Sequence, residues 1–108
     1  MSDFNEFLKV LKDNTEDIAR NSWKEYRKAA MKDGGSFIRK TKADLERWTM
    51  LLSEGKLTQD DFAWLVQGKR DLAVLEAMKQ EGLSQVQLNR FRNALVDVVV
   101  NTAVGIFL

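Results

Sequence analysis

Two pairs of adjacent acids and one pair of glycines are the first candidates for chemistry in this chain. Acid pairs can hold metal ions, but Glu16-Asp17 and Asp60-Asp61 fall on expected helices. Adjacent side chains on a helix point about 100° apart and cannot chelate as a unit. Glycine pairs can cradle phosphates, but Gly34-Gly35 lacks the preceding strand and the spacing of a GxGxxG or GxxxxGKS loop. We therefore expect helix-surface acids, and a turn between two helices at the glycines.

The side chains that most often carry catalysis are missing. The sequence contains no histidine and no cysteine. Histidine titrates near neutral pH and is the commonest metal ligand, and cysteine supplies thiolate nucleophiles. Without histidine, neither a Ser-His-Asp triad nor a metal pair held by Glu-x-x-His motifs can form. An enzyme that uses lysine or carboxylates alone is the catalytic alternative, but we expect a non-catalytic protein without a cofactor or a metal.

Basic side chains gather in the middle of the chain. The net charge is only +1, yet residues 20–47 hold nine bases and four acids. Such a face suits an acidic protein partner, anionic lipid or nucleic acid, although a pI of 8.0 makes nucleic acid less favoured. The alternative is that these bases only complement the dipole of a long helix whose start is acidic. The predicted partner-binding face consists of Arg20, Lys24, Arg27, Lys28, Lys32, Arg39 and Lys40.

Glycine-containing stretches divide the chain into four expected helices. No proline interrupts them, so each of the first three runs from a capping residue to a glycine, and the fourth runs from its capping residue to about residue 108. We expect helices over about 2–32, 36–54, 58–81 and 84–108, the third starting at the cap Thr58 and the fourth at the cap Ser84. Apolar residues recur every three or four positions, as on helices with one face in a core. The sequence therefore predicts one all-α domain over residues 1–108, a four-helix bundle with a long first helix and short connections.

The last segment is unusually apolar for a helix of a small bundle. From Ala94 onward the clearly polar side chains are Asp97, Asn101 and Thr102. Its β-branched residues also favour a strand, but no second strand is expected with which it could pair. We expect three neighbouring helices to leave an exposed apolar patch, with a tightly wrapped monomer as the alternative. The predicted homodimer interface consists of Val96, Val99, Val100, Ala103, Val104 and Phe107.

The three tryptophans occupy different positions relative to the apolar faces. Trp48 lies on the apolar face of its expected helix and is assigned to the core. Trp23 and Trp64 lie off these faces, and we expect both to be partly buried against neighbouring helices. An exposed tryptophan would instead be a favoured anchor for a binding partner.

The remaining signals concern location and function. No apolar stretch reaches the ~20 residues that span a bilayer, and the start of the chain has no secretory pattern, so a cytoplasmic protein is expected. We expect a protein-interaction or assembly module that acts through helix–helix contacts, such as an adaptor, an assembly factor or an inhibitor. The alternative is a nucleic-acid-associated regulator that uses the basic face of residues 20–42.

Overall fold

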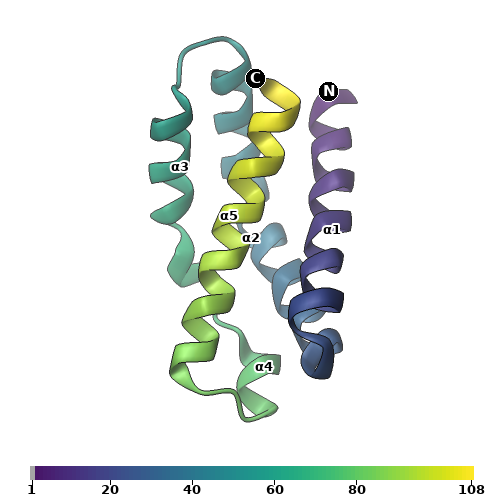
Figure 1. Ribbon diagram of the computed structural model, residues 1–108. Helices are drawn as coiled ribbons and strands as arrows, with labels where there is room; N and C mark the ends of the chain where they lie inside the picture. Colours follow the sequence, from purple (N-terminus) through teal and green to yellow (C-terminus); the bar gives the residue numbers. More distant parts are fainter. Residues whose placement is uncertain (1) are drawn as a thin grey trace.

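Helices form nearly all of residues 2–108, which are the residues that the computed structural model describes (Figure 1). This part of the chain contains no strand, so the predicted all-α bundle is confirmed. Short 3-10 turns at Lys24–Tyr26 and Arg70–Leu72 connect some of the helices. The helices are α1 (Ser2–Ser22), α2 (Arg27–Ser53), α3 (Gln59–Gln67), α4 (Glu76–Gln80) and α5 (Gln85–Phe107).

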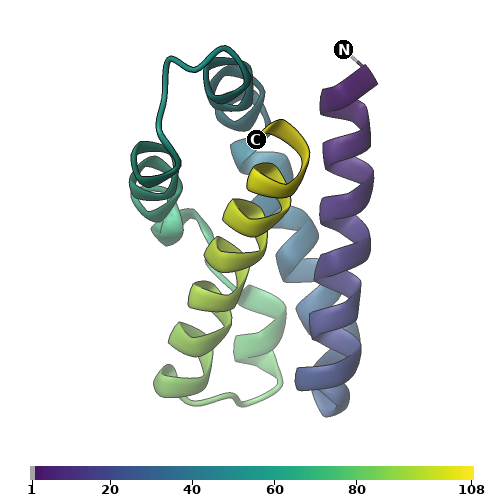
Figure 2. The same ribbon diagram turned by 45° about the horizontal axis from the view of Figure 1, so that its top comes forward.

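The bundle is elongated, with extents of 42 × 23 × 19 Å. α1 and α2 are antiparallel, α3 and α4 together form a third arm, and α5 returns along the bundle, so both termini lie at the same end (Figure 1). Figure 2 shows α5 between α3 and α1, and α5 also contacts α2. Each of α1, α2, α3 and α5 contributes one fully buried phenylalanine to the core: Phe7, Phe37, Phe62 and Phe91.

The first break between helices lies at Trp23 and not at the glycine pair. The predictions that one helix ends near Lys32 and that Gly34-Gly35 forms a turn are both wrong, because α2 runs through the two glycines. The turn forms instead where the Trp23 indole is buried, with its ring edge-on to Phe91 at 5.3 Å between centroids. Burying this side chain anchors the 3-10 turn that reverses the chain between α1 and α2.

The glycine pair serves helix packing. A Cβ on Gly34 would lie 2.8 Å from the Thr15 methyl group on α1 and 3.5 Å from Leu95 on α5. Thr15 cannot easily move away, because it is buried and its hydroxyl donates to the Leu11 carbonyl at 2.7 Å. Gly34 therefore permits α2 to approach two other helices, whereas Gly35 has more room.

The third arm is divided where a continuous helix was predicted over 58–81. The predicted caps are confirmed: Thr58 forms a capping box with Asp61, and Ser84 forms one with Gln87. However, α3 ends at Gln67, and α4 begins only after Leu75, which has a left-handed φ of 60°. Gly82, with φ 87°, follows the end of α4. The arm is thus two helices joined by a short irregular segment.

The homodimer interface predicted on α5 is largely covered by the chain itself. Helices α1, α2 and α3 pack around α5, and between residues 94 and 107 its exposed positions are Asp97, Asn101 and Gly105. The expectation of an uncovered valine patch is therefore wrong. The homodimer stays a prediction, but the exposed patch from which it was argued is absent from the described part of α5. Of the six predicted interface side chains, four are buried, namely Val96, Val99, Val100 and Ala103. The other two, Val104 and Phe107, are half-buried.

The two neighbouring glycines provide a matched pair of substitutions. Gly34→Ala is expected to lower the free energy of unfolding by about 1–3 kcal/mol, because the new methyl group would overpack against Thr15. Gly35→Ala is expected to raise it by up to about 1 kcal/mol, because alanine favours the helix and its Cβ meets only Arg39, at 3.6 Å. Urea denaturation of both variants measures the difference. Equal effects would contradict a close helix crossing at Gly34.

Candidate functional site

The predicted basic face is exposed, but it does not form one stripe on one helix. All seven of its side chains are solvent-exposed. The break at Trp23 leaves Arg20 at the end of α1, where it pairs with Asp17 at 2.8 Å and lies 3.9 Å from Glu16. Arg20 is therefore the member of the face whose charge is partly neutralised. The bases that follow the break are Lys24 in the 3-10 turn and Arg27, Lys28, Lys32, Arg39 and Lys40 on α2.

Three of these bases meet apolar side chains at a groove between α2 and the segment 72–80, which we call the basic groove. Its volume is about 280 Å³, and Lys32, Arg39 and Lys40 line it together with Leu72 and Val74. Leu72 and Val74 are each 38% exposed. Within residues 2–108, none of the three bases forms a salt bridge. The groove therefore combines free positive charge with accessible apolar surface.

One side of the basic groove is held in shape by two hydrogen-bonding side chains. Asp33 of α2 accepts hydrogen bonds from the backbone N–H groups of Ala77 at 3.1 Å and Met78 at 2.8 Å. Arg92 of α5 donates from Nε to the Ala73 carbonyl at 2.7 Å. Asp33 is only 7% exposed, so its two bonds satisfy a carboxylate that would otherwise be buried without partners. Arg92 thereby ties the irregular segment to α5, and Asp33 ties the start of α4 to α2.

Leu75 stands between these two attachments in a conformation that leucine rarely adopts. A left-handed φ costs an L-residue about 1–2 kcal/mol. Its side chain is almost completely buried, and burying a leucine contributes about 1.5–3 kcal/mol. Core packing can thus offset the backbone strain. The turn at Leu75 ends the irregular segment and leaves Leu72 and Val74 at the groove.

Trp64 is the most exposed large apolar side chain in the described part of the chain, at 76%. The expectation that it is partly buried is wrong, whereas Trp23 and Trp48 are buried. Asp60 and Asp61 lie one turn earlier on α3 and are exposed, and no base occurs between Thr58 and Gly68. We call this surface the Trp64 face. It combines a large exposed apolar side chain with two acids, and no base, on the same helix.

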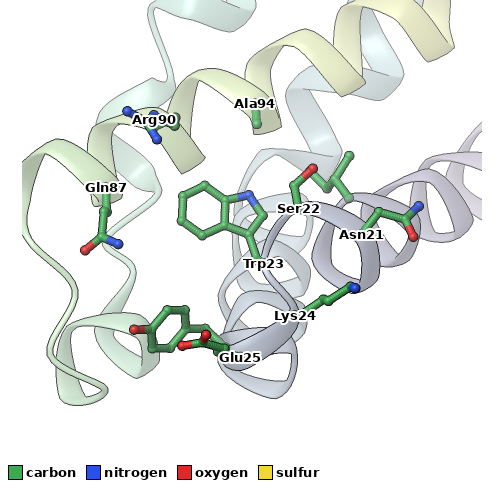
Figure 3. Close-up of a pocket in the computed structure, with 10 residues that line it drawn as sticks. Asn21, Ser22, Trp23, Lys24, Glu25, Gln87, Arg90 and Ala94 are labelled. Carbon is green, nitrogen blue, oxygen red and sulfur yellow. The ribbon is translucent and has the colours of Figure 1, made fainter.

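A second hollow, of about 620 Å³, lies where the α1–α2 turn faces α5 (Figure 3). The Trp23 ring lies between Gln87 and Arg90 of α5 on one side and the turn on the other. Lys24, Glu25 and Arg90 give the hollow charges of both signs, and all three are exposed. Because both signs are present, these charges favour neither an anion nor a cation strongly.

The acid pairs behave as helix-surface charges, as expected. Asp61 accepts from the Thr58 backbone N–H in the α3 capping box, and Glu16-Asp17 faces Arg20. No group of three or more acidic side chains in residues 2–108 could hold a metal ion. In the same part of the chain, none of the helices has the length and apolar character needed to cross a membrane.

Comparisons with protein-family models, with curated proteins and with solved structures find no match to this chain. A function must therefore be argued from its own surfaces, of which the basic groove and the Trp64 face are the most distinctive.

Removing the carboxylate of Asp33 is expected to loosen the wall of the basic groove. Asp33→Ala leaves two backbone N–H groups without acceptors and should lower the free energy of unfolding by about 1–3 kcal/mol. Hydrogen exchange measured by NMR should speed up most at Ala77 and Met78. Asp97→Ala, at an exposed position of α5, is the matched control and should change neither quantity. Unchanged exchange at both amides in Asp33→Ala would contradict the capping role.

Proposed function

We propose that this chain is a non-catalytic protein-interaction module that binds its partner through α3, with Trp64 as the anchor. The observation that carries the proposal is the 76% exposure of the Trp64 side chain. Tryptophan is among the residues that contribute most to protein–protein binding energy, because one side chain removes a large apolar area from water. Leaving so much indole in water is unfavourable for the isolated chain, and a partner would relieve it.

The construction of α3 supports this proposal. Its start is held by the Thr58–Asp61 capping box, and its inner side is anchored by the buried Phe62 and Val66. Trp64 therefore projects from a rigid helix, so little backbone entropy is lost when a partner orders around it. Other exposed apolar side chains, such as Val86 at 68%, are smaller, and isolated residues of this kind are common on protein surfaces.

The substitution Trp64→Ala tests the proposal. We expect it to weaken partner binding by about 30-fold or more, which is the loss expected for a hot-spot residue. The measurement is quantitative crosslinking and capture from cells that produce the tagged full-length chain. Val86→Ala, at another exposed apolar position, is the matched control and should capture the same proteins as wild type. Circular dichroism should show that both variants fold.

Two outcomes of this experiment are decisive. Loss of specific captured proteins in Trp64→Ala, together with their retention in Val86→Ala, supports the proposal. The proposal is contradicted if Trp64→Ala captures the same proteins as wild type and also associates with itself as wild type does.

The second candidate function is a nucleic-acid-associated regulator. The observation that favours it is that Lys24, Arg27 and Lys28 line one hollow, of about 650 Å³, at the end of the bundle where α1 turns into α2. Exposed bases attract phosphates by releasing counterions. However, Glu25 and Glu81 line the same hollow and oppose such binding. We therefore favour the protein-interaction module.

Salt-dependent binding to a generic DNA duplex separates the two functions. For an interaction module we expect no binding even at about 50 mM salt, where nucleic-acid affinity is still strong. For the regulator, fluorescence anisotropy would show binding that decreases with salt and is lost in Arg27→Glu/Lys28→Glu. Both positions are exposed and form no salt bridge within the described chain, so the double variant should fold normally.

A further inference from the structure

We infer that the basic groove of one copy of this chain receives Trp64 of a second copy. The inference rests on the proposed function, since it names the partner of the Trp64 face. The two surfaces are different parts of the molecule, because Trp64 does not line the groove of its own chain. Each copy therefore carries one donor surface and one acceptor surface.

The size of the basic groove favours one inserted side chain. A volume of about 280 Å³ equals the space of about nine water molecules in the liquid. This space is enough for a large side chain but not for a helix. A partner helix would thus lie across the rim and insert a single anchor. Trp64, which projects from α3 with most of its surface exposed, is a side chain of this kind.

The charges of the two surfaces are complementary. The groove presents Lys32, Arg39 and Lys40, which form no salt bridge in the described chain. Around Trp64 lie Asp60 and Asp61, without a base on the same helix. Docking would bring the two carboxylates to the basic rim, while the same contact between two Trp64 faces would oppose like charges.

The acids of the groove do not cancel this attraction. Asp33 lines the groove, but its two carboxylate oxygens already accept the Ala77 and Met78 N–H groups. Glu76 is the other acid of the lining. The three bases exceed these two acids, so the groove keeps a net positive charge.

The apolar parts of the two surfaces also match. Leu72 and Val74 are exposed at the groove and provide a surface against which an indole can pack. Arg39 at the rim can stack on the indole face, because guanidinium groups are attracted to aromatic rings. The chain already contains such a pair, with the Arg47 guanidinium carbon 5.8 Å from the centre of the Trp48 ring.

Sedimentation equilibrium of the purified full-length chain tests the inference. For wild type we expect an average mass that rises between low and high micromolar concentration, and that falls when salt screens the charged rim. Trp64→Ala removes the donor surface, and Arg39→Glu/Lys40→Glu inverts the acceptor surface. Each variant should raise the dissociation constant by about 30-fold or more. Arg27→Glu/Lys28→Glu makes the same charge change on the same helix outside the groove, and should associate as wild type does.

A mixing experiment distinguishes this contact from other kinds of self-association. The Trp64→Ala chain keeps an intact groove, and the Arg39→Glu/Lys40→Glu chain keeps an intact Trp64 face. Two variants that are monomeric alone should therefore form a one-to-one complex when mixed. Failure of the mixture to associate, while wild type does, would overturn the inference.

A wild-type chain that stays monomeric at high micromolar concentration would also overturn the inference. The proposed function would survive that result if Trp64→Ala still abolished the capture of other proteins from cells. The two proposals can therefore fail separately.

Discussion

The close approach of α2 to its neighbours at Asp33 and Gly34 is the constraint on which the rest of this bundle depends. Gly34 has no Cβ, and this allows α2 to meet α1 at Thr15 and α5 at Leu95 in the same place. The preceding residue, Asp33, caps α4 through two backbone N–H groups. Two consecutive residues thus attach α2 to three other helices. The position of α4, and with it the wall of the basic groove, follows from this crossing.

The local signals in the sequence were sufficient for the fold class but not for the course of the chain. Capping boxes at Thr58 and Ser84 involve residues only three positions apart, so they could be predicted. The role of Gly34 could not, because a glycine that permits a turn and one that permits a close crossing look the same until the neighbouring helix is placed. The turn at Trp23 depends on burial of this side chain against Phe91, 68 positions later in the sequence. No glycine or proline next to Trp23 indicates a turn there.

In the candidate site, too, features set by local sequence could be predicted, whereas features set by contacts between helices could not. Exposure of the bases follows from their charge, yet their division between the groove and the end of the bundle depends on tertiary packing. The exposure of Trp64 could have been predicted from helix geometry. Successive residues on a helix are about 100° apart, so Trp64, two positions from both Phe62 and Val66, points away from the side that these two residues bury. The valines of α5 were misassigned because their coverage depends on how closely three neighbours wrap the helix. The missing Cβ of Gly34 allows that closeness where α2 meets α5.

The basic groove exists because the chain does not continue α3 into α4. A continuous helix would satisfy its own N–H groups and would require neither a buried carboxylate at Asp33 nor a left-handed residue at Leu75. Instead, the start of α4 depends on Asp33 of α2 for its hydrogen bonds, and the segment before it depends on Arg92 of α5. These bonds tie the groove wall to the core, so its shape is set before any partner arrives. Preorganisation of this kind would lower the entropy lost if the groove received the side chain proposed for it.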